Sequence, residues 1–204
     1  IKYLIAGKNF SAGVGINSVN CEQTKKDQLK RKFSLIKKNM DFYDKKFVKK
    51  INLKFIVICK NLTVSDIPAI GFANPEMKTI ILNINTKDKI LQRVLHHEIF
   101  HIIHKNFNDY FSESKWIEFN KPGFKYSACS TCKEYFSLSP LNFTEGFFTD
   151  YAKTSVPEDM AETFSFLVLN NEYLRKKIKK DSVLKNKTNL IKENILKINN
   201  DFKF

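Results

Sequence analysis

The stretch Leu95-His96-His97-Glu98-Ile99-Phe100-His101 decides how the rest of the chain is interpreted, because it contains the pattern H-E-x-x-H at His97, Glu98 and His101. On a helix, residues four apart lie one turn apart on the same face, so the two histidines can bring two imidazole nitrogens to one Zn²⁺. Glu98 projects beside them and can accept a proton from a metal-bound water. The same pattern also recurs by chance in unrelated proteins, where it is a solvated helix face.

The residues around this stretch predict a helix that packs on a small sheet. An apolar stripe at helical spacing runs through residues 90–103 and anchors one side of the helix. Two β-branched runs, 54–59 and 79–84, come before it and predict buried strands. The strand that directly precedes the helix could bind an extended peptide by edge pairing.

A second helix is predicted from Ser155, a favourable N-cap residue, to about Leu169. Glu158 and Glu162 lie four residues apart on one face of it, so one can bind the metal while the other orients a ligand histidine. The spacing from Ser155 to Glu158 is also that of a capping box, and spacing alone does not separate the two interpretations. His104 is a weaker candidate for the third ligand, because its side chain lies further along the first helix.

The two helical motifs together resemble a known family of enzymes. His97-Glu98-x-x-His101 and Tyr151-x-x-Thr154-x-x-x-Glu158-x-x-Ala161-Glu162-x-Phe164 are similar to the glutamate-zincin (gluzincin-like) peptidases, among them the group with the catalytic domain of anthrax lethal factor. Segments 116–126 and 146–152 further resemble bacterial and fungal proteins called zinc-binding metallopeptidases. The resemblance covers about residues 40–170.

Roles for three residues come from this resemblance. It implies that Glu158 is the third zinc ligand and that Glu162 accepts a hydrogen bond from a ligand histidine. It also implies that the hydroxyl of Tyr151 stabilises the oxyanion. A phenol donor near the metal suits that task, because one such hydrogen bond contributes about 2.7–4 kcal/mol to the transition state. Core packing remains the alternative role for Tyr151.

Composition favours a folded protein with a basic surface. The 204 residues are 43% hydrophobic and include 19 phenylalanines, but they carry a formal net charge of +14. Such an excess can attract nucleic acid, anionic lipid or acidic substrates. The lysines are scattered through both terminal regions without a recognisable reading motif, so we expect an ordinary solvated surface and no specific nucleic-acid partner. No apolar run approaches the roughly 20 residues of a membrane helix.

The four cysteines, Cys21, Cys59, Cys129 and Cys132, allow three full pairings and do not settle the redox compartment. A disulfide among them is the favoured interpretation, ahead of reduced core thiols and of a second zinc site at Cys129-Ser-Thr-Cys132. The sequence opens at Ile1 without a methionine, which fits a cleaved export signal and a trimmed chain alike. We expect a secreted or extracytoplasmic protein.

These observations predict a single α+β domain over residues 1–204 with a zincin-like arrangement. It would combine a small mixed sheet, the active-site helix, the glutamate helix and a helical C-terminal region, with an irregular aromatic layer over 106–150. The segments 21–50 and 172–204 would form basic helical flanks around the core.

The function expected from this arrangement is Zn²⁺-dependent hydrolysis of a protein or peptide substrate by a monomer, with Glu98 as the general base. Two other functions stay open. One is a nucleic-acid-associated metalloprotease, and the other is a catalytically silent zinc-binding interaction module.

Overall fold

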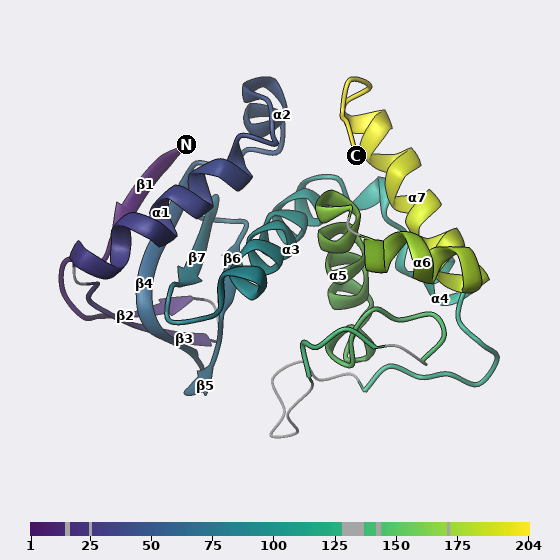
Figure 1. Ribbon diagram of the computed structural model, residues 1–204, viewed down its shortest axis with the longest axis horizontal. Helices are drawn as coiled ribbons and strands as arrows, with labels where there is room; N and C mark the ends of the chain where they lie inside the picture. Colours follow the sequence, from purple (N-terminus) through teal and green to yellow (C-terminus); the bar gives the residue numbers. More distant parts are fainter. Residues whose placement is uncertain (15–16, 25, 128–136, 142–143, 171) are drawn as a thin grey trace. The chain divides into compact units, whose positions relative to one another are not determined.

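The computed structural model describes residues 1–204 except 15–16, 25, 128–136, 142–143 and 171 (Figure 1). The chain divides into two compact units, residues 1–106 and 107–204. Helices and strands both contribute, which confirms the predicted α+β class with its small mixed sheet. The assignment of the whole chain to one domain stays a prediction. None of the helices in the described part of the chain is long and apolar enough to cross a membrane.

The first unit contains a mixed sheet, one short helix and two long helices. Its elements are β1 (Lys2–Ile5), β2 (Phe10–Val14), β3 (Asn17–Glu22), α1 (Lys26–Met40), α2 (Lys45–Lys50), β4 (Phe55–Val64), β5 (Ile67–Pro68), β6 (Gly71–Asn74), β7 (Thr79–Asn83) and α3 (Asp88–Asn106). Both predicted strands and the predicted metal-binding helix are present. The segment before Cys21, for which no strand was predicted, contains β1, β2 and most of β3.

Strand β4 is the centre of this sheet. It pairs in parallel with β1 and β7 and antiparallel with β3, and the sheet order is β2-β3-β4-β7-β6. Because side chains alternate across a strand, Ile56 and Ile58 of β4 point to one face, where Ile80 and Leu82 of β7 meet them. All four are fully buried. Helix α3 packs on β6 and β7, so this apolar face fixes the helix that carries H-E-x-x-H.

The sheet order corrects the expectation about edge pairing. β7 is the strand that directly precedes α3, but it lies between β4 and β6 and has neighbours on both sides. The edge of the sheet beside it is β6, which, among the residues that the structure describes, pairs only with β7. A sequence cannot show this order, because two β-branched runs do not say which strand ends outermost.

A smaller apolar cluster contains a disulfide. Cys21 of β3 and Cys59 of β4 are bonded, with their Cα atoms 5.8 Å apart. Both are buried among Val19, Leu62 and Ile81. The favoured interpretation of the cysteines is confirmed for this pair, and Cys129 and Cys132 lie outside the described residues.

The second unit is helical apart from long irregular stretches. Its elements are η1 (Asn108–Tyr110), α4 (Glu113–Ile117), η2 (Tyr151–Lys153), α5 (Val156–Leu169), α6 (Glu172–Lys180) and α7 (Ser182–Ile198). Helix α5 is almost entirely buried and contacts α4, η2 and α7. Ser155 is its N-cap, as predicted, and Asn170 ends it in a left-handed conformation with φ 37°. The C-terminal helices are also present as predicted.

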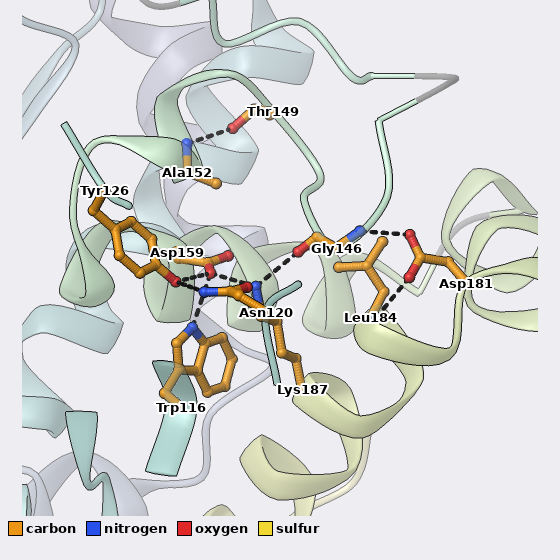
Figure 2. A network of polar contacts seen from close by, with 10 residues as sticks. All are labelled: Trp116, Asn120, Tyr126, Gly146, Thr149, Ala152, Asp159, Asp181, Leu184 and Lys187. Carbon is orange, nitrogen blue, oxygen red and sulfur yellow. Dashed lines mark hydrogen bonds and ion pairs between the residues drawn. The ribbon is translucent and has the colours of Figure 1, made fainter. Parts of the chain in front are cut away.

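A buried polar network joins the parts of this unit (Figure 2). Asp159 of α5 accepts three hydrogen bonds at Oδ2, from Trp116 Nε1 at 2.8 Å, Tyr126 Oη at 2.7 Å and Lys187 Nζ at 2.7 Å. Lys187 also donates to the carbonyl oxygen of Gly146 at 2.8 Å. Asp159, the fourth residue of α5, therefore connects this helix directly to α4, α7 and the segment of Tyr126, and through Lys187 to Gly146.

Lys187 is an exception to the expectation that the lysines are solvated surface. Its side chain and that of Asp159 are both fully buried, and the ammonium lies 4.1 Å from the centroid of the Phe147 ring. Burial raises the pKa of Asp159 and lowers the pKa of Lys187, while the attraction between the two charges opposes both shifts. The helical spacing of α7 gave no sign of this, since a lysine on an apolar face is ordinarily extended toward water.

Candidate metal centre

His97 and His101 of α3 bring their Nε2 atoms to 3.1 Å from each other. Two nitrogens bound to one tetrahedral zinc ion at about 2.0–2.1 Å each stand roughly 3.3 Å apart. The separation in the structure therefore fits two ligands of one metal ion. His97 is buried and His101 half-buried, so the pair belongs to a sheltered site and not to a fully solvated helix face.

Glu98 is buried beside the pair, and the backbone of β6 makes room for it. A Cβ atom placed on Gly71 would stand 2.6 Å from both Cγ and Oε1 of Glu98, and 2.6 Å from Cγ1 of Val94. Real Cβ atoms do not come this close to their neighbours, so the carboxylate keeps its position only because residue 71 is glycine. Gly71 is the first residue of β6, and a glycine in a strand can mark the close approach of another group.

His96, next to the pair, is part of the core. The buried phenol of Tyr43 donates to its Nδ1 at 2.7 Å, and its Nε2 lies 3.2 Å from Oδ1 of Asn39. Burial lowers the pKa of His96 to about 3, which keeps the ring neutral. The sequence shows three histidines within six residues, and the hydrogen bonds of the structure assign this one a structural role.

His104, the weaker candidate for a ligand, lies further along α3 as expected. Its ring stacks on that of Phe100, with centroids 6.0 Å apart and an interplanar angle of 17°. The His104 ring therefore has a packing role along the helix.

In the second unit, the start of α5 carries both glutamates. The backbone N–H of Glu158 donates to Oγ of the N-cap residue Ser155 at 3.4 Å, so the capping interpretation of this spacing is correct for the backbone. The cap uses the backbone of Glu158 and not its side chain, and the residue is half-buried. Glu162 is fully buried, and its Oε2 accepts a hydrogen bond from Oγ1 of Thr149 at 2.8 Å.

Tyr151 is the first residue of η2, the short turn before α5. The carbonyl oxygen of Tyr151 accepts from both the backbone N–H and the hydroxyl of Thr154, at 3.1 Å and 2.8 Å. Its ring is half-buried. The turn that carries the predicted oxyanion donor is thus closed by its own hydrogen bonds.

His97, His101 and Glu158 offer one ligand atom each and could hold a metal ion. Two imidazoles and one carboxylate are a donor set suited to a catalytic zinc ion, which takes three protein ligands and keeps a fourth position for water or substrate. An α+β fold with such a set, and with a glutamate directly after the first histidine, defines the class of metallopeptidase-like proteins.

The sequence comparison identifies the family within this class. Residues 32–201 match the family described as "Putative zinc-binding metallo-peptidase", and the chain belongs to that family. No curated protein matches the chain.

Proposed function

We propose that this protein is a zinc-dependent peptidase with His97, His101 and Glu158 as its metal ligands. The observation that carries the proposal is the pair of Nε2 atoms on α3, 3.1 Å apart, in a chain that belongs to a zinc-binding metallopeptidase family. The half-buried carboxylate of Glu158 supports the choice of the third ligand, as does the capped helix end that holds its backbone.

Bound Zn²⁺ would supply Lewis acidity, polarising the scissile carbonyl and lowering the pKa of water at the site. Glu98 would act as the general base, accepting a proton at its carboxylate from the attacking water and passing it to the nitrogen of the leaving amine. The burial of Glu98 and its close approach to Gly71 support this role, because they hold the carboxylate in one place.

Two further residues have proposed roles beside this base. Tyr151 would donate a hydrogen bond from its phenol to the developing oxyanion. Glu162 would accept a hydrogen bond from the second ring nitrogen of a ligand histidine and so fix its tautomer. These are the roles implied by the resemblance to glutamate zincins and to the catalytic domain of anthrax lethal factor. The position of Tyr151 in η2, directly before the helix that carries Glu158 and Glu162, supports it.

The proposed substrate is a protein or peptide. We also propose that the protein works outside the cytoplasm, because the Cys21–Cys59 bond is of the kind that persists in oxidising compartments. A thiol-reactive mass tag applied to unreduced protein from its native host should leave Cys21 and Cys59 unlabelled. Labelling of both would reject this localisation.

Metal analysis and a cleavage assay test the function together. The wild-type chain should carry one zinc ion, lose hydrolysis of a fluorogenic peptide library after chelation and regain it on addition of Zn²⁺. His97→Ala should lose zinc and activity, whereas Glu98→Gln should keep zinc and lose nearly all activity. Tyr151→Phe should keep zinc and lose about a hundredfold or more in kcat.

The variants also separate the alternatives. Undiminished zinc in His97→Ala would reject the site on α3. If Glu162→Ala loses all metal and Glu158→Ala retains it, then Glu162 is the third ligand and Glu158 is not. A wild-type chain that binds zinc and cleaves no member of the library would favour the silent zinc-binding module.

A further inference from the structure

The hydroxyl of Thr149 connects the turn that carries Tyr151 to the side chain of Glu162. Its Oγ1 accepts a hydrogen bond from the backbone N–H of Ala152 at 3.2 Å (Figure 2). The same atom lies 2.8 Å from Oε2 of Glu162. Thr149, Ala152 and Glu162 are all fully buried.

The direction of the second hydrogen bond follows from the carboxylate, which has no proton to donate. A hydroxyl has one proton to donate, and the amide of Ala152 uses one of the lone pairs on the Thr149 oxygen. The proton therefore goes to Oε2 of Glu162, which accepts it. Oε1 is then the oxygen suited to the ring N–H of a ligand histidine, as the proposed role of Glu162 requires.

Segment 149–155 is consequently attached to α5 at two points. At one end, Ser155 Oγ accepts from the backbone N–H of Glu158, and at the other, Thr149 donates to the side chain of Glu162. Tyr151 lies between these attachments, on the turn whose Ala152 amide is bonded to Thr149. The two attachment points are the two glutamates of the proposed metal centre, four residues apart on one helix.

We infer that Thr149 is a positioning residue of the metal centre, which orients the Glu162 carboxylate and holds the Tyr151 turn against it. The inference rests on the proposed function. Without the hydroxyl, Glu162 loses this donor and the buried amide of Ala152 loses its acceptor, so both groups are held less firmly. Loss of a group that directly orients a metal ligand lowers metal affinity by about 10–100-fold, and Thr149 acts through such a group, Glu162, so we expect the low end of this range.

The test compares two substitutions at this position. Thr149→Val keeps the shape of the side chain and removes the hydroxyl, whereas Thr149→Ser keeps the hydroxyl and removes the methyl group. We expect Thr149→Val to bind Zn²⁺ about tenfold more weakly in competition with a chromophoric chelator. Its kcat should fall with little change in KM, and Thr149→Ser should stay within about threefold of the wild type in zinc affinity.

Thr188→Val is the matched control. Thr188 is equally buried, and its hydroxyl donates to the carbonyl oxygen of Lys185 at 2.9 Å within α7. Thr188→Val loses one buried hydrogen bond and Thr149→Val loses two, but only Thr149→Val should lose zinc affinity. If Thr149→Val does not fold, Thr149→Ala removes the same hydroxyl with less bulk and provides the comparison.

Each outcome decides one of two questions. A wild-type chain without zinc rejects the proposed function itself. If the wild type binds zinc and the hydroxyl-free variants bind it equally well, only the role of Thr149 is overturned. Equal losses in Thr149→Ser and Thr149→Val overturn it too, because they would assign the effect to packing of the methyl group. Retention in Thr149→Ser with loss in Thr149→Val supports it.

Discussion

Helices α3 and α5 each carry two residues of the proposed metal centre at a spacing of four, but the two helices are held in different ways. α3 lies on an apolar sheet, and its buried residues are mostly aliphatic or neutral, including a histidine kept uncharged by its surroundings. The first turn of α5 is held by a buried ion pair and by hydroxyl groups.

The difference teaches which kind of change each half of the site tolerates. Apolar packing weakens in proportion to the contact area that is lost. A buried charge that loses its partner costs far more, because the remaining charge has no water around it. We therefore expect a single substitution in the buried ion pair at α5 to lower stability by a large amount. Substitutions in the apolar packing of α3 should lower stability in proportion to the contact area that they remove.

The largest effect should come from removing the cation at position 187. Lys187→Met leaves the Asp159 carboxylate buried without a counter-charge and should cost about 3–5 kcal/mol in the free energy of unfolding. Trp116 is the only tryptophan of the chain and donates to Asp159, so its fluorescence reports directly on this network during urea unfolding.

Two variants control this measurement. Lys185→Met, which changes an exposed lysine of the same helix, should stay within about 0.5 kcal/mol of the wild type. The double variant Asp159→Asn with Lys187→Met should recover part of the loss, because no unpaired charge remains. A loss below about 1 kcal/mol in the free energy of unfolding of Lys187→Met would show that α5 does not depend on the buried ion pair.

A smaller effect, on activity and not on stability, is expected at Gly71. The new methyl group of Gly71→Ala would overlap Cγ and Oε1 of Glu98, and the carboxylate should swing away. Loss of a well-placed general base costs about 10²–10⁴-fold in rate, so kcat should fall by about a hundredfold while zinc is retained. Gly13→Ala is the control, because a Cβ at Gly13 has nothing within 4 Å. Unchanged kcat in Gly71→Ala would mean that Glu98 is not held by this contact.

The smallest effect is a pH dependence of the free energy of unfolding. It tests whether His96 of α3 is held uncharged in the core. The pKa of His96 is about 3 in the folded chain, against an ordinary value of 6.5. Below pH 6.5 the unfolded chain therefore binds a proton that the folded chain does not, and stability falls as the pH is lowered toward 3. Between pH 7 and pH 5 the loss should be about 2 kcal/mol.

Urea unfolding of the metal-free chain at these two pH values measures the effect. His96→Gln should remove most of the pH dependence, whereas His104→Gln, at a half-buried position of the same helix, should leave it largely in place. An unchanged pH dependence in His96→Gln would show that another group is responsible.

The sequence by itself determined the periodic parts of this protein. Apolar spacing along 90–103, a serine cap before Val156 and β-branched runs at 54–59 and 79–84 predict their elements, because these signals lie within one helix turn or one strand. For the same reason the sequence predicts that His97 and His101 can share a metal ion. The distance between their ring nitrogens agrees with it.

Only the tertiary structure decided the rest, because it depends on residues far apart in the chain. The space for Glu98 comes from a glycine 27 positions earlier, and the charge on Asp159 is balanced by a lysine 28 positions later. The Cys21–Cys59 bond likewise joins residues 38 positions apart. No local pattern marks such partners, since burial and pairing become visible only when strands and helices from different segments come together.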